Sequence, residues 1–345
     1  MYLHQALKEP DRVHWMNAMR EEVKAHVDKD NWEMVLRSSV PHGVPILPAV
    51  WAMRRKRRIA TREVYKWKAR LNLDGSKQVK GVNYQDTYAP VAGWSTIRIV
   101  LMKAILNAWP TKQIDYVMAF PQADVENENM FMKIPKGFEV DDSQGREWVL
   151  RLKKNLYGQK QAGRVWNKYL VKCLKSIGFI QSQVDECLFF RGQFIYVICT
   201  DDSILTGPNE QELDQVIEEI KGTGLDITVE GDVSDFLGVK IQQLPNGDIN
   251  LTQPQLIDQI LFDLRLGGDA KSPTVTKTTP MASSRILYKH PDSASFDGHF
   301  DYRSIIGKML YLEKSTRPDI AYAVHHSALA LLRTPRRNMV RQSSG

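Results

Sequence analysis

Two short apolar runs flank a pair of acidic residues in the stretch FIYVICTDDSILT, residues 194–206. The runs Phe194–Cys199 and Ile204–Thr206 have the length of single strands, and Asp201-Asp202 lies between them. We therefore predict a β-hairpin that carries two carboxylates near its tip. Taken alone, the doublet is typical of an ordinary hairpin turn, because aspartate is a common turn residue.

The neighbouring segments extend this hairpin into a sheet. Gln113–Phe120 is short and apolar apart from Asp115, so we predict a core strand there. Apolar residues recur at helical spacing over Lys160–Ile177 and Glu210–Ile220, and Leu225–Val229 has the pattern of a strand. The order is strand, helix, strand, strand, helix, strand, which is the ferredoxin-like order. It predicts an antiparallel sheet with two helices on one face and an open face on the other.

In such a sheet the first strand and the hairpin are neighbours, so Asp115, Asp201 and Asp202 would meet. Crowded carboxylates repel one another, and a divalent cation relieves that repulsion. Hard oxygen ligands suit Mg²⁺, and two ions about 3.5–4 Å apart can support an in-line phosphoryl displacement. Because successive strand residues face opposite ways, we expect Asp201 to be the main ligand and Asp202 the weaker one.

The composition is that of an ordinary globular protein. The chain has 345 residues, 43% of them hydrophobic and 25% charged, which excludes a disordered tail, a collagen-like fibre and a small disulfide scaffold. No apolar run approaches the roughly 18 residues of a membrane span, and we expect neither a secretory signal nor membrane contact. The three cysteines have no C-x-x-C spacing, so we expect a reducing compartment.

One segment carries the excess of positive charge. The chain has a net charge of +7, and residues 54–70 hold nine Lys or Arg against one acid, Glu63. Trp51, Tyr65 and Trp67 lie in or beside this segment, an arrangement that suits phosphate contact with base stacking. A solvated charged hairpin or a localisation signal would have the same composition. We predict two strands around a turn here.

Other parts of the chain have simpler patterns. We predict helices over residues 11–28, 95–108 and within 301–324, and a hairpin that joins 236–242 to 248–252 around Pro245-Asn246-Gly247. Residues 271–285 are rich in Lys, Ser, Thr and Pro, which is typical of a linker.

Taken together, these segments resemble the reverse transcriptase domain of copia-type long-terminal-repeat retrotransposons. The resemblance runs from about Ala6 to Val324. The matching segments, in chain order, are 15–22, 31–35, 65–71, 81–84, 88–91, 113–120, 155–162, 201–202, 236–239, 302–307 and 316–323.

The resemblance implies an α+β, right-hand polymerase fold with fingers, a ferredoxin-like palm built on an antiparallel sheet, and a partial thumb or connection. Residues 1–245 would form the fingers and palm, including the primer-grip hairpin. Residues 246–324 would form a thumb- or connection-like segment, and 325–345 a loose basic tail.

The resemblance also implies roles for individual residues. Asp115, Asp201 and Asp202 would be the catalytic, metal-binding triad, with the Tyr116 carbonyl as an additional ligand. Phe120 would lie under the sugar and favour deoxynucleotides, although a core Phe that ends a strand would have the same pattern. The remaining substrate contacts would come from Lys68 and Arg70 at the triphosphate, and from Tyr157 and Gly158 in the nucleotide pocket.

The implied activity is template-directed DNA synthesis from deoxynucleoside triphosphates, with two Mg²⁺ ions or Mn²⁺ in their place. Its partners would be an RNA template, a DNA primer or product, and a second copy of the chain or virus-like particle components. Its location would be cytoplasmic particles, with nuclear entry. The alternatives are an inactive retrotransposon remnant that only binds nucleic acid, a metal-dependent nuclease, and a purely electrostatic binding protein.

The sequence departs from the family at three places. Cys199-Thr200 stands where the family has Tyr followed by an apolar residue, and Gly163 stands where it has proline. Pro121-Gln122-Ala123 stands where it has Leu-Asn-Gly. The likeness fades after Val324, so we expect a truncated copy of a Pol polyprotein.

Overall fold

The computed structural model describes residues 2–57, 63–231, 233–266, 279–281, 298 and 300–332. The chain divides into two compact units, Met1–Asp232 and Val233–Gly345. The units divide between residues 232 and 233, before the expected boundary at residue 245. The hairpin predicted over residues 236–252 therefore belongs to the second unit. Within the described ranges, no helix is both long and apolar enough to cross a membrane.

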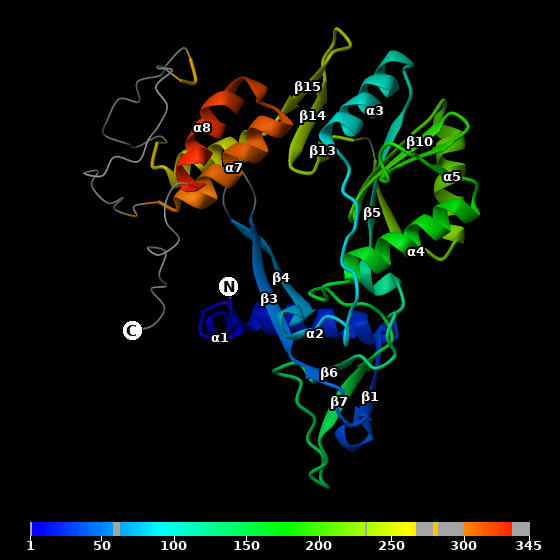
Figure 1. Ribbon diagram of the computed structural model, residues 1–345, viewed down its shortest axis with the longest axis vertical. Coiled ribbons are helices and arrows are strands. Elements are labelled where there is room, and N and C mark those ends of the chain that lie inside the picture. Colours follow the sequence, from blue (N-terminus) through cyan, green and yellow to red (C-terminus); the bar gives the residue numbers. More distant parts are fainter. Residues whose placement is uncertain are drawn as a thin grey trace. The chain divides into compact units, whose positions relative to one another are not determined.

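A six-stranded antiparallel sheet, here called the central sheet, belongs to the first unit, and Figure 1 labels its strands β5 and β10. Its strand order is β12-β5-β11-β10-β9-β8. Their bounds are β5 Thr111–Tyr116, β8 Ile180–Gln181, β9 Leu188–Arg191, β10 Phe194–Cys199, β11 Asp202–Thr206 and β12 Ile227–Gly231. The predicted hairpin is β10–β11, and the first four strands of the order have the predicted ferredoxin-like arrangement. Strands β8 and β9 extend it at one edge.

Helices α4 (Ala162–Ser176) and α5 (Glu210–Gly222) pack on one face of the central sheet, as predicted. Ile114 and Tyr116 of β5 point into this helix-covered core, so Asp115 between them faces the other side. That side is not fully open. Asp115 and Asp202 are partly exposed there, whereas Val197 and Ile204, which share their face, are completely buried.

The strand predicted over 113–120 ends earlier than expected. β5 stops at Tyr116, a turn follows, and Phe120–Gln122 form a short 3-10 helix. Met118 has a left-handed φ of 52°, and Pro121 has no N–H to donate to a strand partner. The apolar pattern continues because Ala119 is still completely buried, although the backbone has left the sheet.

A long two-stranded ribbon, β3 (Ala49–Arg57) and β4 (Val64–Leu73), carries the basic segment. The residues that join the two strands, 58–62, lie outside the described residues. Helix α2 (Arg12–Asp28) packs along one face of the ribbon. The buried residues of that contact are Trp15, Met19, Trp51, Met53, Ala69 and Leu71.

The carboxylate of Asp11 fixes the ribbon to the start of α2. It accepts hydrogen bonds from Arg55 Nε and Nη2 at 2.8 and 2.9 Å, and from the indole nitrogens of Trp15 and Trp67. The hydrogen bond from Arg55 is the main reason why the pKa of Asp11 lies far below its usual range. A bidentate guanidinium–carboxylate pair gives geometric specificity, so it sets the register of ribbon on helix.

The first unit also contains a short helix near its start, a second sheet and a longer helix. They are α1 Leu3–Ala6, a four-stranded sheet in the order β1-β7-β6-β2 (Trp32–Leu36, Trp148–Leu152, Phe131–Lys133, Ile46–Leu47), and α3 Trp94–Leu106. Helix α3 is the one predicted over residues 95–108.

The second unit contains a three-stranded sheet and three helices. They are β13 Asp235–Phe236, β14 Val239–Gln243, β15 Ile249–Thr252, α6 Pro254–Asp263, α7 Tyr302–Ser315 and α8 Ala321–Leu332. The hairpin predicted around residues 245–247 is β14–β15, but Leu237 and Gly238, both with positive φ, separate β13 from it. The predicted tail is wrong for 325–332, which continue α8; residues 333–345 and most of the predicted linker lie outside the described residues.

Gly158 is the point where the backbone at the end of β4 meets the segment before α4. It has a φ of +88°, and a Cβ placed on it would lie 2.2 Å from the Leu73 carbonyl oxygen. Gly43 has a similar φ of +82° and no atom within 4 Å of such a Cβ.

We predict that Gly158→Ala destabilises the protein by about 1–3 kcal/mol more than Gly43→Ala, because only the first adds a backbone clash to the cost of the left-handed φ. The measurement is urea unfolding of both variants followed by tryptophan fluorescence. Equal losses would show that the backbone near Leu73 can move aside without cost.

Candidate active site

The strand register brings Asp115 and Asp202 together. Asp202 is the first residue of β11, and its Cα partner across the β11–β5 pair is Asp115. Side chains directly opposite each other in an antiparallel pair lie on the same face, with Cβ atoms about 4.5–5.5 Å apart. The backbone N–H of Tyr116 donates to the Asp201 carbonyl at 3.3 Å, so the third aspartate borders the same point.

The tip of the hairpin is a strained two-residue turn, Thr200-Asp201. Cys199 pairs with Asp202, and Thr200 has a left-handed φ of 64°, which is unusual for a β-branched residue. The Trp166 indole on α4 donates to the Thr200 carbonyl at 2.8 Å and holds this turn from the helix side. The turn supplies the bend that both aspartates need to reach Asp115. Asp202 is the one directly opposite it.

Asp115 and Asp202 are both harder to ionise than a free aspartate. Burial raises the pKa of Asp202 to about 6, with the negative charges of Asp201 and Asp115 as further causes. Burial also raises the pKa of Asp115, and the charges of Asp201 and Glu230 add to the effect. This pattern is typical of sites that bind a cation or transfer a proton.

Glu230 is a fourth acidic residue at the site, and sequence reasoning missed it. It lies in β12, where the pairing with β5 shifts between Val229 and Gly231, and its carboxylate accepts from Gln113 Nε2 at 2.8 Å. Such a bulge turns one extra side chain out of the regular alternation. Gly231, with a φ of +85°, is the sequence signal that could have indicated a bulge.

The acidic residues fit a magnesium ion in their chemistry. They offer hard carboxylate oxygens, they are partly accessible to water, and their charges need a counter-ion. Within the part of the chain that the structure describes, no three His, Cys, Asp or Glu side chains already converge as metal ligands. The backbone therefore places the donors at one site without orienting their oxygens around one point.

Three of the predicted substrate-binding residues stack on one another. The Arg70 guanidinium lies over the Tyr157 ring, 3.9 Å from the ring centroid. The Phe120 ring also packs against the Tyr157 ring, with 4.8 Å between the two centroids and 38° between the ring planes. Tyr157 is held at its backbone, where its carbonyl accepts from Leu73 N at 2.8 Å. A groove of about 640 Å³ lies beside the stack, and Gly158 is among its lining residues.

Lys68 lies within electrostatic range of both the stack and the carboxylates. Burial, followed by the charges of Arg70 and Lys56, lowers its pKa, and its own charge counteracts the rise in the pKa of Asp115.

Tyr116 does not place its side chain at the site. Its side chain is buried on the helix side of the sheet, where its hydroxyl is hydrogen-bonded to that of Tyr196, so only its backbone borders the carboxylates.

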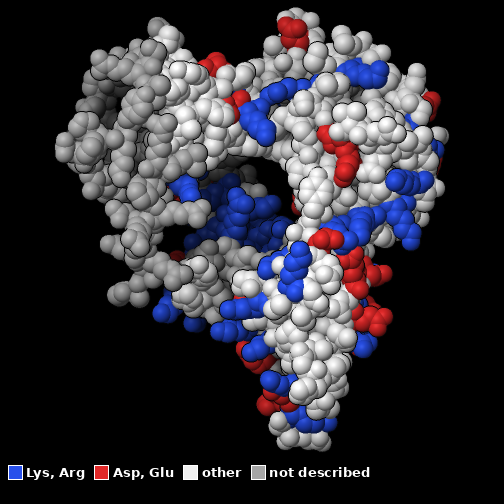
Figure 2. Space-filling model, in the orientation of Figure 1, with Lys and Arg blue, Asp and Glu red and all other residues white. Residues whose placement is uncertain are grey.

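The face of the ribbon that points away from α2 carries a row of five cations, here called the cation row. The register of β3 and β4 places Arg54 opposite Lys68 and Lys56 opposite Lys66, with Arg70 next along β4. Like charges directly opposite each other are destabilising. None of the five has an ion-pair partner among the described residues, and Figure 2 shows Lys and Arg gathered over this ribbon.

Residues 29–283 match the family described as reverse transcriptase (RNA-dependent DNA polymerase), and the chain belongs to that family. It is similar to retrotransposon proteins over 93% of its length: 33% identical over 328 residues to the retrovirus-related Pol polyprotein from transposon RE1 of Arabidopsis thaliana, and 28% identical over 338 residues to that from transposon TNT 1-94 of Nicotiana tabacum. The resemblance inferred from the sequence is thereby confirmed.

The chain spans about a fifth of the length of these relatives, 21% and 24%. Among solved structures, a foamy viral protease-reverse transcriptase in complex with double-stranded DNA matches 86% of this chain and 40% of its own, at 14% identity and a TM-score of 0.44. A likeness that distant does not place individual residues.

We predict that Asp202→Asn stabilises the metal-free protein at pH 8 by roughly 1–2 kcal/mol, because it removes a carboxylate whose ionisation the fold opposes. An acid whose pKa is raised to about 6 in the folded state lowers stability as pH rises from about 4 to 6, so the two proteins should differ little at pH 4. Thermal unfolding at both pH values measures this, with Asp214→Asn on the exposed face of α5 as control.

The same variants test whether the carboxylates bind a cation. Mg²⁺ at pH 8 should raise the melting temperature of the unaltered chain more than that of Asp202→Asn, since a ligand stabilises only the state that binds it. Equal shifts in both proteins would contradict a metal site that includes Asp202.

Proposed function

We propose that this chain carries out template-directed DNA synthesis from deoxynucleoside triphosphates, on an RNA or DNA template, by two-metal-ion nucleotidyl transfer. The observation that carries the proposal is the strand register that sets Asp202 opposite Asp115, with Asp201 in the adjoining turn. The stack of Arg70, Tyr157 and Phe120 supports it, since all of these groups belong to the same unit.

In this proposal Asp115, Asp201 and Asp202 would hold the Mg²⁺ ions. When bound, such ions lower the pKa of the attacking 3′-hydroxyl and neutralise charge on the displaced phosphates. Lys68 and Arg70 would bind the triphosphate, the arginine through a planar fork that matches phosphate oxygens. Phe120, held against Tyr157, would lie under the sugar, where a ring leaves no room for a 2′-hydroxyl.

The phosphate backbone of template and primer would bind Arg54, Lys56 and Lys66, the remaining members of the cation row. Its cations lie opposite one another without carboxylate partners in the described residues, and a bound polyanion removes their mutual repulsion. The indoles of Trp51 and Trp67 are turned to the α2 face of the ribbon, so base stacking by these two residues is not part of the proposal.

A second candidate is a remnant that binds nucleic acid without polymerising. The observation in its favour is the hairpin tip, where Cys199 is buried and Thr200 strained in place of the family's usual pair.

Both candidate functions would be carried out within a larger protein. We propose that the chain acts as part of a Pol polyprotein, with other copies or particle components, in cytoplasmic particles that later give access to the nucleus.

We predict that the purified chain extends a DNA primer on an RNA template with dNTPs and Mg²⁺, and that Asp115→Asn lowers the rate at least about a hundredfold. Template–primer affinity, measured by fluorescence anisotropy, should change little. Tight binding without extension by the unaltered chain would favour the remnant. Template degradation without dNTPs would favour a nuclease.

We also predict that the double variant Arg54→Ala/Lys66→Ala lowers the slope of log affinity against log salt by about 2, one unit per lost phosphate contact. The matched control removes two exposed lysines of α4, Lys172 and Lys175, from the opposite side of the central sheet. If the control variant lowers the slope by the same amount, nucleic-acid affinity depends on the net charge of the protein and not on the cation row.

A further inference from the structure

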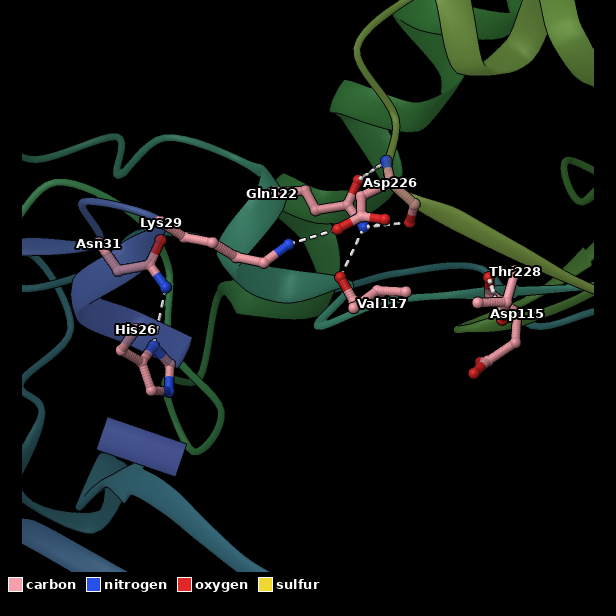
Figure 3. A network of polar contacts seen from close by, with 8 residues as sticks. All are labelled: His26, Lys29, Asn31, Asp115, Val117, Gln122, Asp226 and Thr228. Atoms are coloured by element: carbon pink, nitrogen blue, oxygen red, sulfur yellow. Dashed lines mark hydrogen bonds and ion pairs between the residues drawn. The ribbon is translucent and has the colours of Figure 1, made fainter. Parts of the chain in front are cut away.

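The turn that carries Phe120 is closed by one side chain, that of Gln122 (Figure 3). Its Nε2 donates to the carbonyl oxygens of Val117 and Asp226, both at 2.8 Å, and its Oε1 accepts from Asp226 N at 2.9 Å. Val117 N also donates to the Asp226 carbonyl at 3.0 Å. Gln122 thus uses both ends of its amide to continue, through a side chain, the pairing that β5 and β12 begin.

This closed turn is also fixed to helix α2. Asp226 forms an ion pair with Lys29, the residue that follows α2, and Figure 3 shows both side chains converging with Gln122. The pair is partly exposed, so by itself it contributes little. The connection to the central sheet is made by the Gln122 amide, together with the hydrogen bond from Val117 N to the Asp226 carbonyl just before β12.

Phe120 lies inside the closed turn. Val117 is anchored on one side of it and Gln122 on the other, while its ring rests on Tyr157. The turn contains Met118 in a left-handed conformation, which costs free energy and persists only where the surroundings impose it. The buried Ala119 and the hydrogen bond from Val117 N to the Asp226 carbonyl also hold this turn. The Gln122 amide adds three side-chain hydrogen bonds, one of which joins it to Val117 across the turn, so its loss would let the strain relax and Phe120 move with the backbone.

We propose that Gln122 is a positioning residue that sets the place of the Phe120 ring and thereby the preference for deoxy- over ribonucleotides. The inference rests on the proposed function, because it assumes that Phe120 meets the sugar. A ring that excludes a hydroxyl group acts over a fraction of an ångström, so a small shift of the turn admits the larger sugar.

The chemistry of the amide gives an isosteric test. Gln122→Glu keeps the shape and the acceptor for Asp226 N, but a carboxylate cannot donate to the two carbonyl oxygens. Gln122→Met keeps the volume and removes both functions. Gln181→Ala is the matched control, since that amide also donates to a backbone carbonyl at 2.8 Å, of Glu186, at the far edge of the same sheet.

The experiment measures kcat/KM for dNTP and for the matching ribonucleotide in primer extension by the full chain. Phe120→Ala serves as the reference for a lost sugar gate. We expect Gln122→Glu and Gln122→Met to reduce the preference for dNTP roughly ten- to a hundredfold, mainly by raising ribonucleotide use, and Gln181→Ala to leave it unchanged.

The outcomes separate the inference from the function on which it rests. A lower preference in Phe120→Ala but not in the Gln122 variants overturns the role of Gln122 alone. An unchanged preference in Phe120→Ala overturns the assignment of the sugar gate as well. Failure of both Gln122 variants to fold, judged by circular dichroism, would also overturn the proposal, because the residue would then be structural and not specific to the sugar.

Discussion

The fold places like charges against each other and holds them there. The register of β11 on β5 sets Asp202 opposite Asp115, and the register of β3 on β4 sets Arg54 opposite Lys68. Neither pairing stabilises a sheet, since cross-strand like charges are unfavourable. Both persist because the opposite face of each sheet is buried: α4 and α5 cover the central sheet, and α2 covers the ribbon.

The helix-covered face of each sheet stabilises it, and the like charges lie on the other face. The buried face leaves local patterns in the sequence, and these patterns allowed the fold to be predicted. Helical spacing over the segment that became α4 and the short apolar run around Asp115 are local patterns imposed by burial, and the ferredoxin-like order followed from them. The approach of three aspartates then followed from topology alone. The sequence did not show which member of the doublet lies directly opposite Asp115, because the left-handed Thr200 bends the chain at that point.

The features that the sequence did not reveal are those in which side chains replace regular backbone pairing. Val117–Phe120 continued the apolar pattern of β5, so the turn was concealed. The left-handed Met118 and the bonds of Gln122 to Val117 and Asp226 show where the strand ends. Glu230 reaches the site through a bulge, which depends on a register shift between distant strands. Neither a bulge nor a long-range amide contact has a local period that a sequence pattern could reveal.

The unfavourable charges have a common physical resolution. In the proposed function, a nucleoside triphosphate with its divalent cations would bring positive charge to the carboxylates and negative charge to Lys68 and Arg70, so one ligand would relieve both repulsions. Burial strengthens each effect, as the raised pKa of Asp202 and the lowered pKa of Lys68 indicate. Natural proteins depart from local rules of stability mainly at functional sites. The two groups of like charges have opposite signs, and Lys68 is close enough to act on Asp115; this is the argument that they would serve one ligand.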